Sequence, residues 1–131
     1  MGVHFPSVAS TAVANALPAT ATETAICTTP PLNLSLDNAQ VILLWMAAIT
    51  AGTSTTALVM RIRRGTGITG TLLNVGAWTF TTVAGNLAQI SGNYIDTPGI
   101  VGGQQYSLTC SQTAASGAGT LNDVCLVAFV L

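Results

Sequence analysis

Hydrophobic and polar residues alternate in short runs along most of the chain, and this pattern predicts β-strands. In residues 30–36, PPLNLSL, a leucine stands at every second position from 32 onward, with Asn33 and Ser35 between the leucines. This period of two is typical of a strand with one buried face. Residues 40–49, QVILLWMAAI, are apolar at both parities, which predicts a central strand that is buried on both sides.

Further strands are predicted at intervals of about ten residues. They are the runs ETAICTT, ALVMRIRR, TLLNV, AWTFTTVA, AQISGNYI, QQYSLTCSQ and LNDVCLVAFVL, separated by segments rich in Gly, Pro, Asn and Asp. No run has the helical period of about 3.6 residues. We therefore expect an all-β protein, a single jelly-roll-like β-sandwich of about eight antiparallel strands that spans residues 20–131.

Residues 1–19 lack this pattern and are expected to form an extended N-terminal arm. They are rich in Ala, Thr, Ser and Val, and Pro6 and Pro18 disfavour a continuous helix. Two interpretations stay open. The arm is disordered, as chain ends commonly are, or it lies on a neighbouring molecule, which Phe5 and Val8 would contact. The segment lacks the basic and apolar regions of a secretory signal, so we expect none.

The surface of this sandwich must be nearly uncharged. Only 5% of the 131 residues are charged, and the formal net charge is −1. Such a chain has little electrostatic repulsion to keep its copies apart, so we expect an assembly. Three basic residues are too few for nucleic-acid binding, which depends on Lys and Arg at phosphates. The longest apolar run, about a dozen residues, is too short for a membrane-spanning helix, and we expect neither partner.

All three basic residues lie close together, as Arg61, Arg63 and Arg64. Arg61 and Arg63 share the polar face of the predicted strand 57–64, and Arg64 stands where a turn begins. The interpretation that we favour is a solvated strand face that also discourages edge-to-edge association. The alternative is a partner contact, in which the arginines pair with carboxylates of a neighbouring subunit.

The glycines that follow, Gly65, Gly67 and Gly70, have the spacing G-x-G-x-x-G, which also occurs in dinucleotide-binding sites. That site requires a helix directly after the glycines. Here the next residues, TLLNVGAWTFTT, are rich in β-branched and aromatic side chains. We therefore interpret the glycines as a turn between two strands and expect no nucleotide cofactor.

Residues that carry catalysis or bind metals are scarce. The only histidine is His4, in the arm, whereas Ser-His-Asp and Cys-His sites need a well-held histidine. Of the four acidic residues, three stand beside turns, and the three cysteines show no metal-ligand spacing. We expect no enzymatic activity, no metal, no cofactor and no small-molecule substrate.

The last two predicted strands can be placed in two ways. In a direct hairpin, Cys110 would face Cys125, and residues 106, 108, 110, 125, 127 and 129 would share the core face. In a jelly roll the two strands lie in opposite sheets, and the same parity would direct both sets inward from either side. A disulfide is geometrically conceivable, but free buried thiols are the more frequent outcome for an odd number of cysteines.

The other face of the last strand is also apolar and carries Val124, Leu126, Ala128 and Val130. We expect a second copy of the chain to cover these residues as an oligomer interface. Burial at about 25 cal/mol per Å² of apolar surface would contribute several kcal/mol per subunit. The alternative is that the N-terminal arm covers this face.

Residues 55–131 carry a resemblance to known proteins. A strand with basic residues precedes a G-T turn, the segment IDTPG leads into the strand that begins YSL, and a strand with the sequence CLVAFVL comes last. This order resembles small virion proteins with a tumour-necrosis-factor-like or viral jelly-roll fold. It is a pattern and not a diagnostic motif. The resemblance implies trimeric capsid decoration (cement) proteins or the knobs of phage fibres, although a fold does not determine a function.

Three hypotheses about function follow from the resemblance. In the first, the chain is a bacteriophage decoration protein, a homotrimer on the capsid surface of the virion that uses its arm as a strap on the capsid protein. In the second, it is the trimeric receptor-binding knob of a fibre. In the third, it is a small shell protein, but it lacks the basic arm of many genome-packaging shells. The uncharged arm and the lack of an obvious aromatic-lined site favour the first.

Overall fold

The structure is a computed structural model that describes residues 7–11, 15–17, 22–53, 56–112 and 119–131, and most of them form β-strands. The strands are β1 (Ser7–Thr11), β2 (Asn15–Ala16), β3 (Thr24–Thr28), β4 (Leu32–Leu34), β5 (Val41–Thr50), β6 (Thr56–Arg64), β7 (Thr71–Leu72), β8 (Trp78–Thr82), β9 (Leu87–Asp96), β10 (Gly102–Gln104), β11 (Tyr106–Gln112) and β12 (Thr120–Val130). One turn of 3₁₀ helix, Gly67–Thr69, is the only helical element of the described residues. The expected all-β class is confirmed.

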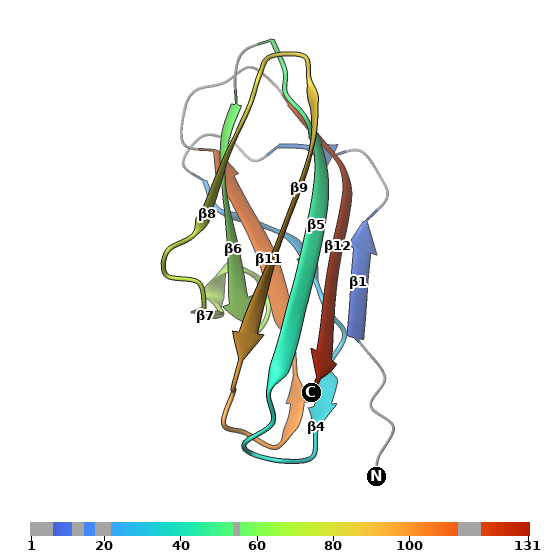
Figure 1. Ribbon diagram of the computed structural model, residues 1–131, viewed down its shortest axis with the longest axis vertical. Helices are drawn as coiled ribbons and strands as arrows, with labels where there is room; N and C mark the ends of the chain where they lie inside the picture. Colours follow the sequence, from blue (N-terminus) through green and yellow to red (C-terminus); the bar gives the residue numbers. More distant parts are fainter. Residues whose placement is uncertain (1–6, 12–14, 18–21, 54–55, 113–118) are drawn as a thin grey trace.

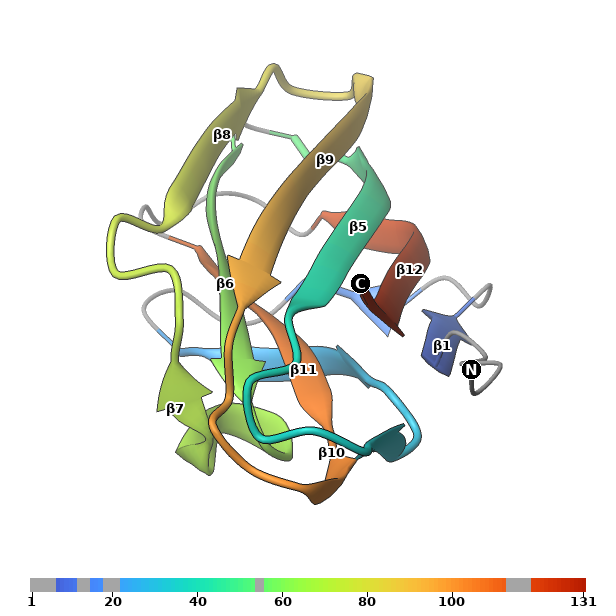
Figure 2. The ribbon, with the colours of Figure 1, turned by 60° about the horizontal axis from the view of Figure 1, so that its bottom comes forward.

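Two five-stranded antiparallel sheets stack on each other, as Figures 1 and 2 show from two directions, and β4 pairs with β10 in a separate two-stranded sheet. Sheet A has the strand order β1-β12-β5-β9, with β2 also paired to β12. Sheet B has the order β3-β11-β6-β7, with β8 also paired to β6. In Figure 1, β5, β9 and β12 lie in front of β6 and β11. This arrangement confirms the jelly-roll-like β-sandwich that the alternation predicts.

Three strands of the structure were not predicted from the sequence. β1 and β2 belong to the segment expected as an arm, and β10 is a Gly-Gly-Gln segment that is too short to show alternation. β1 and β2 pair with β12, and Leu17 lies in the core. The predicted boundary between residues 19 and 20 falls in a segment outside the described residues, and so does Phe5. The arm as a separate unit therefore stays a prediction.

The core lies between the two sheets and follows the predicted alternation in β6. Leu58, Met60 and Ile62 point inward and are fully buried. In β5 the burial also alternates: the side chains at 41, 43, 45, 47 and 49 enter the core, whereas Leu44 and Met46 point outward and are exposed. The prediction that this strand is covered on both sides is therefore wrong for the described residues.

The prediction for the two faces of β12 is reversed in the structure. The residues expected as an oligomer interface, Val124, Leu126, Ala128 and Val130, belong to the core or pack against it. Cys125, Val127 and Phe129 lie on the outer side and are half-buried. The cause is the pairing with β5, which places Leu126 opposite the inward-pointing Trp45 and Cys125 opposite the outward-pointing Met46. Since both faces are apolar, the sequence pattern did not distinguish them.

The last two long strands do not form a hairpin, because β11 lies in sheet B and β12 in sheet A. Cys110 points into the core as expected, but Cys125 does not, and all three cysteines are free. Burial raises the pKa of the thiols of Cys27 and Cys110 to about 12. These two thiols are therefore protonated and unreactive at neutral pH.

Aromatic rings fill one part of the core, and a glycine makes room for them. The Trp45 ring centroid lies 5.4 Å from that of Trp78 and 5.9 Å from that of Phe80. Gly92 of β9 pairs with Trp45, and a Cβ atom at Gly92 would lie 2.6 Å from the indole Nε1. The backbone of β9 can therefore approach the ring only because residue 92 has no side chain.

We predict that Gly92→Ala destabilises the protein by about 1–3 kcal/mol, because the added methyl group overpacks the core against the Trp45 ring. Urea denaturation followed by tryptophan fluorescence measures the free energy of unfolding. Gly76→Ala is the matched control, since its Cβ would meet no atom within 4 Å. Equal stability of the two variants would contradict this account of the core.

Candidate functional site: two outer faces of the sandwich

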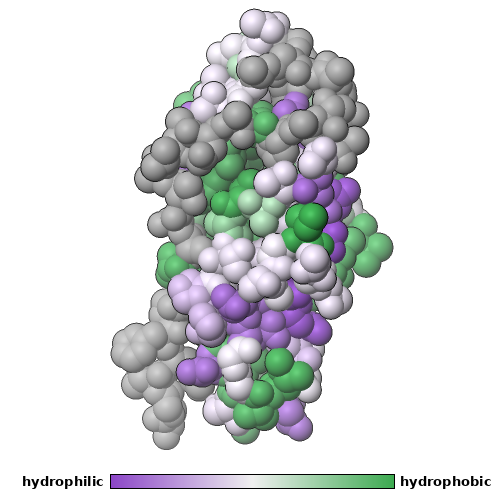
Figure 3. Space-filling model, turned by 180° about the vertical axis from the view of Figure 1, so that it is seen from behind, coloured by the Kyte–Doolittle hydropathy of each residue, from purple (hydrophilic) through white to green (hydrophobic). Residues whose placement is uncertain are grey.

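The outer face of sheet B carries two of the three arginines. β6 pairs with β11 on one side and with β7 and β8 on the other, so it is not an edge strand and its arginines do not protect an edge. Figure 3, which shows the molecule from behind, has hydrophilic side chains gathered across the middle of this face. The middle of this face is therefore polar, as the alternation in residues 57–64 predicts, with hydrophobic side chains above and below it in Figure 3.

Arg63 is paired within the chain. Its Nε and Nη2 donate to the two carboxylate oxygens of Glu23, each at 2.8 Å, and its Nη1 donates to the carbonyl oxygen of Gly70, also at 2.8 Å. This is the bidentate geometry in which Arg–carboxylate pairs are strongest. The hydrogen bonds from Arg63 lower the pKa of Glu23, although partial burial acts in the opposite direction.

Arg64 takes part in an ion pair that connects the two sheets. It extends from the end of β6 in sheet B and donates through Nε and Nη2 to the carboxylate of Asp96, at the end of β9 in sheet A. The hydroxyl of Tyr106, from β11, donates to the same carboxylate at 3.0 Å. Asp96 is only 4% exposed. Burial first, and then the charge of Asp96, raise the pKa of Tyr106, so this phenol stays a hydrogen-bond donor.

Arg61 differs from the other two arginines. Its Nη1 donates to Oγ of Ser111 at 3.2 Å, and among the described residues it forms no ion pair with a carboxylate. The structure thus joins Arg63 and Arg64 to carboxylates of their own chain, whereas Arg61 forms no such pair among the described residues. A partner contact through the arginines stays a prediction.

The three glycines after the arginines form a turn, as predicted. Gly65 and Gly67 have φ angles of 106° and 65°, which are costly for residues with a side chain. A Cβ at Gly70 would lie 2.5 Å from the carbonyl oxygen of Arg64. Ser107 Oγ holds the turn by donating to the Gly65 carbonyl and accepting from the Gly67 N–H. The spacing G-x-G-x-x-G therefore serves the turn between β6 and β7.

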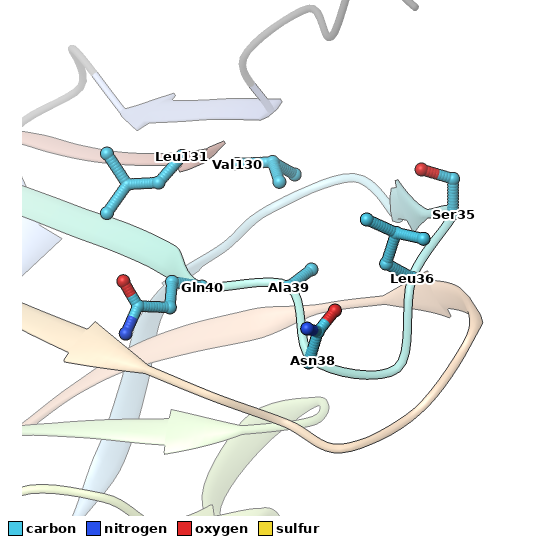
Figure 4. Close-up of a pocket in the computed structure, with 7 residues that line it drawn as sticks. All are labelled: Ser35, Leu36, Asn38, Ala39, Gln40, Val130 and Leu131. Atoms are coloured by element: carbon cyan, nitrogen blue, oxygen red, sulfur yellow. The ribbon is translucent and has the colours of Figure 1, made fainter.

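One surface hollow of about 290 Å³ lies at an end of the sandwich, and Figure 4 shows its lining. The residues come from the loop after β4 and from the end of β12: Ser35, Leu36, Asn38, Ala39, Gln40, Val130 and Leu131. Their side chains include no acid, base or thiol. The hollow has no side chain suited to general acid–base catalysis.

Two further findings concern the described residues alone. No group of three or more His, Cys, Asp or Glu side chains among them is arranged to hold a metal ion. No helix that the structure describes has the length and apolar character needed to cross a membrane.

The outer side of β5 and β12 in sheet A is apolar, and we call it the apolar face. Its centre consists of six side chains, Ile42, Leu44 and Met46 on β5 and Cys125, Val127 and Phe129 on β12. Leu44 and Met46 are 44% and 53% exposed. Sequence reasoning missed this surface, although the apolar character of both parities in residues 40–49 was the signal for it. Val8, expected as a partner contact, pairs with Val127 at its rim.

We predict that Glu23→Gln weakens the pH dependence of stability. A carboxylate with a lowered folded pKa stabilises the folded state above its unfolded pKa of about 4.3, and this contribution is lost as the pH falls through the folded pKa. The wild-type free energy of unfolding should therefore decrease below about pH 5, and that of Glu23→Gln should decrease less. Denaturation in urea at several pH values measures both. Asp37→Asn, which removes an exposed carboxylate in a turn, is the matched control, and its free energy of unfolding should decrease at low pH as much as that of the wild type. An equal decrease in Glu23→Gln would contradict the prediction.

We predict that Asp96→Asn destabilises the protein by about 3 kcal/mol, since it leaves the partly buried Arg64 guanidinium without its counter-charge. Thermal and chemical denaturation measure the change. Asp123→Asn is the matched control, because Asp123 is exposed, and its effect should stay within about 0.5 kcal/mol. A small effect in both variants would show that the cross-sheet ion pair contributes little to stability.

The β-sandwich is similar to a part of each of several longer chains in virus structures. A chain in the structure of the Gt strain of infectious bursal disease virus has a TM-score of 0.54 and 12% identity, over 95% of this chain and 33% of that chain. A chain of T=1 particles derived from infectious bursal virus has a TM-score of 0.51 and 12% identity, over 95% and 36%. This chain thus spans about a third of the length of these neighbours. No family model matches the chain, and no curated protein matches its sequence. At this identity the likeness shows the fold alone, a β-sandwich like one found in a virus.

Proposed function

We propose that the chain is a structural protein of a virion, and more specifically a homotrimeric decoration protein on the capsid surface. The observation that carries the proposal is the fold, a sandwich that aligns over 95% of its length with chains from infectious bursal disease virus and from T=1 particles. A bacteriophage as the source and a tumour-necrosis-factor-like trimer remain predictions from the sequence.

The chemistry of the described residues supports a role without catalysis. Glu23 and Asp96 are engaged by arginines of the same chain, and the buried thiols of Cys27 and Cys110 are protonated at neutral pH. Four of the chain's strongest candidates for acid–base or nucleophilic chemistry therefore have structural roles. The apolar face, in contrast, is a surface suited to contact between proteins.

We propose that the arm attaches the chain to capsid protein. β1 pairs with the edge of β12 in its own chain, which shows that the sequence of this segment can add a strand to a sheet edge, and strand addition is a common way for an extended segment to bind another protein. In a strap, residues of the arm would make such contacts with a neighbour, with Phe5 and Val8 as the predicted contact side chains.

A small shell protein is the second candidate, and the likeness to chains from virus particles favours it. Against it, all three basic residues lie at positions 61–64, and two of them are paired with carboxylates, so little positive charge remains for a packaged genome. No specific observation favours the knob of a fibre, the second hypothesis from the sequence.

Particles purified on a density gradient, from the virus or culture that carries this sequence, test the proposal. We predict that an antibody against the chain detects it in the particle peak. If mild denaturant releases the chain and leaves the shells intact, the chain is a decoration protein. If it is released only when the shells are lost, it is a shell protein. Very few copies per particle would identify a fibre knob. Absence from the particle peak would contradict a virion role. Deletion of residues 2–6 removes Phe5 and keeps β1, β2 and the core residue Leu17, and it should abolish attachment if the arm is the strap.

A further inference from the structure

We propose that the apolar face of sheet A is buried against a second copy of this chain. The inference rests on the proposed function in one respect only, namely that a virion protein works as an assembly. It names the surface of contact, and it replaces the interface expected from the sequence, whose side chains lie in the core.

The register of sheet A gathers the six central side chains of the apolar face into one block. Leu44 lies opposite Val127 and Met46 opposite Cys125, while Ile42 lies opposite Phe129 in the same pairing. Directly opposed residues of an antiparallel pair point to the same side. The six side chains therefore form three adjacent apolar cross-strand pairs, which extend along the first half of β5 and the second half of β12.

The apolar face is uneven and has a hollow that can receive a side chain of another molecule. A hollow of about 130 Å³ is lined by Leu44, Trp45, Met46, Cys125 and Val127. Apolar cavities of about 150 Å³ take up groups of the size of benzene. The exposed side chain of Met46 stands beside the hollow, and Met adapts its shape to irregular gaps. One copy thus offers both an apolar protrusion and an apolar recess.

The size of the face suits a functional contact. Ten paired residues of β5 and β12, in strands that rise about 3.3 Å per residue and lie about 4.8 Å apart, cover a plane of roughly 300 Å². β1 widens this plane on one side. On the other side β9 borders it with the exposed polar side chains of Gln89, Ser91 and Asn93, so the apolar centre has a polar rim, as protein interfaces have. The largest apolar patch of a typical monomer is about 300–600 Å² and is often functional.

The near absence of charge favours another copy as the occupant. Within β5, β9 and β12 the charged residues are Asp96, which points inward to Arg64, and Asp123. Asp123 lies opposite Ala48 on the outer side of the sheet and is exposed, so it stands at the border of the apolar face. No cation on these strands is available for an anionic surface, and a single carboxylate is no paired set of charges for an oppositely charged protein. Two copies can bury the six central side chains without loss of hydration of a charged group when Asp123 stays at the rim of the contact.

The described part of the arm does not cover the apolar face. β1 pairs with the free edge of β12 and so lies in the plane of sheet A, where it widens the face and does not lie over it. Val8, which is 47% exposed, extends the apolar surface beyond Val127. A second copy that docks on the face would therefore contact Val8 as well, in agreement with the prediction of a partner contact at that residue.

Light scattering of the full chain over a hundredfold range of concentration tests the inference. At the higher concentrations we expect a mass that is a multiple of 13.3 kDa. Leu44→Asp and Met46→Asp place a charge in the contact, and each should reduce the mass to that of one chain at the same concentrations. Val75→Asp is the matched control: Val75 is 84% exposed, lies outside sheet A, and its variant should keep the wild-type mass.

The unmodified chain provides a second measurement that does not depend on the folding of any variant. Cys125 lines the hollow, whereas Cys27 and Cys110 are buried, so iodoacetamide should react with Cys125 first. If copies bind in pairs, hundredfold dilution from well above the dissociation constant raises the free fraction, and with it the rate of alkylation, by about tenfold.

The outcomes separate this inference from the proposed function. A multiple mass that both aspartate variants retain, with an alkylation rate independent of concentration, would show that copies meet elsewhere and would overturn the inference. A single-chain mass at every concentration would also overturn the inference. In that case slow alkylation of Cys125 would show that the chain's own arm covers the apolar face, and fast alkylation would show that the face is uncovered. Neither result bears on whether the chain is found in particles, which the density gradient decides.

Discussion

The antiparallel pairing of β5 with β12 is the interaction on which the rest of the structure depends. Both strands are apolar at both parities, so either face of each could have entered the core. Their register places Trp45 opposite Leu126 and Met46 opposite Cys125, and the core takes the first pair. Once this choice is made, the second set of apolar side chains must lie on the outside. The apolar face is therefore a direct consequence of the same pairing that forms the core.

Sheet B contains the arginines, and two of them form ion pairs with carboxylates of the same chain. Arg63 joins Glu23 on the outer side of sheet B, and Arg64 reaches across the sandwich to Asp96. These pairs satisfy ions that partial burial would otherwise destabilise. They also remove charge from the surface, because four of the seven charged side chains neutralise one another. Few charged side chains are left for the rest of the surface.

The two sheets thus present different surfaces to the surroundings. The outer side of sheet B is closed by an internal network of hydrogen bonds that includes Ser107 and Thr109, both fully buried. The outer side of sheet A has no comparable network, and its apolar side chains have no cover among the described residues. The outer side of sheet B therefore needs no partner to satisfy its polar groups, whereas the apolar face would gain free energy from contact with another protein.

The all-β class, the sandwich and most long strands could be predicted from the sequence, because alternation and turn residues are local properties. The inward side of β6 followed from Leu58, Met60 and Ile62, and the glycine turn followed from the absence of a helix after Gly70. The partners of the arginines could not be predicted, since Glu23 and Asp96 are 40 and 32 residues away from them. Nor could the inner face of β12, where Val124 and Cys125 are equally acceptable to a core. A local pattern tells which residues share a face of a strand, but only the pairing of segments some 80 residues apart, as between Trp45 and Leu126, decides which face of a doubly apolar strand is buried.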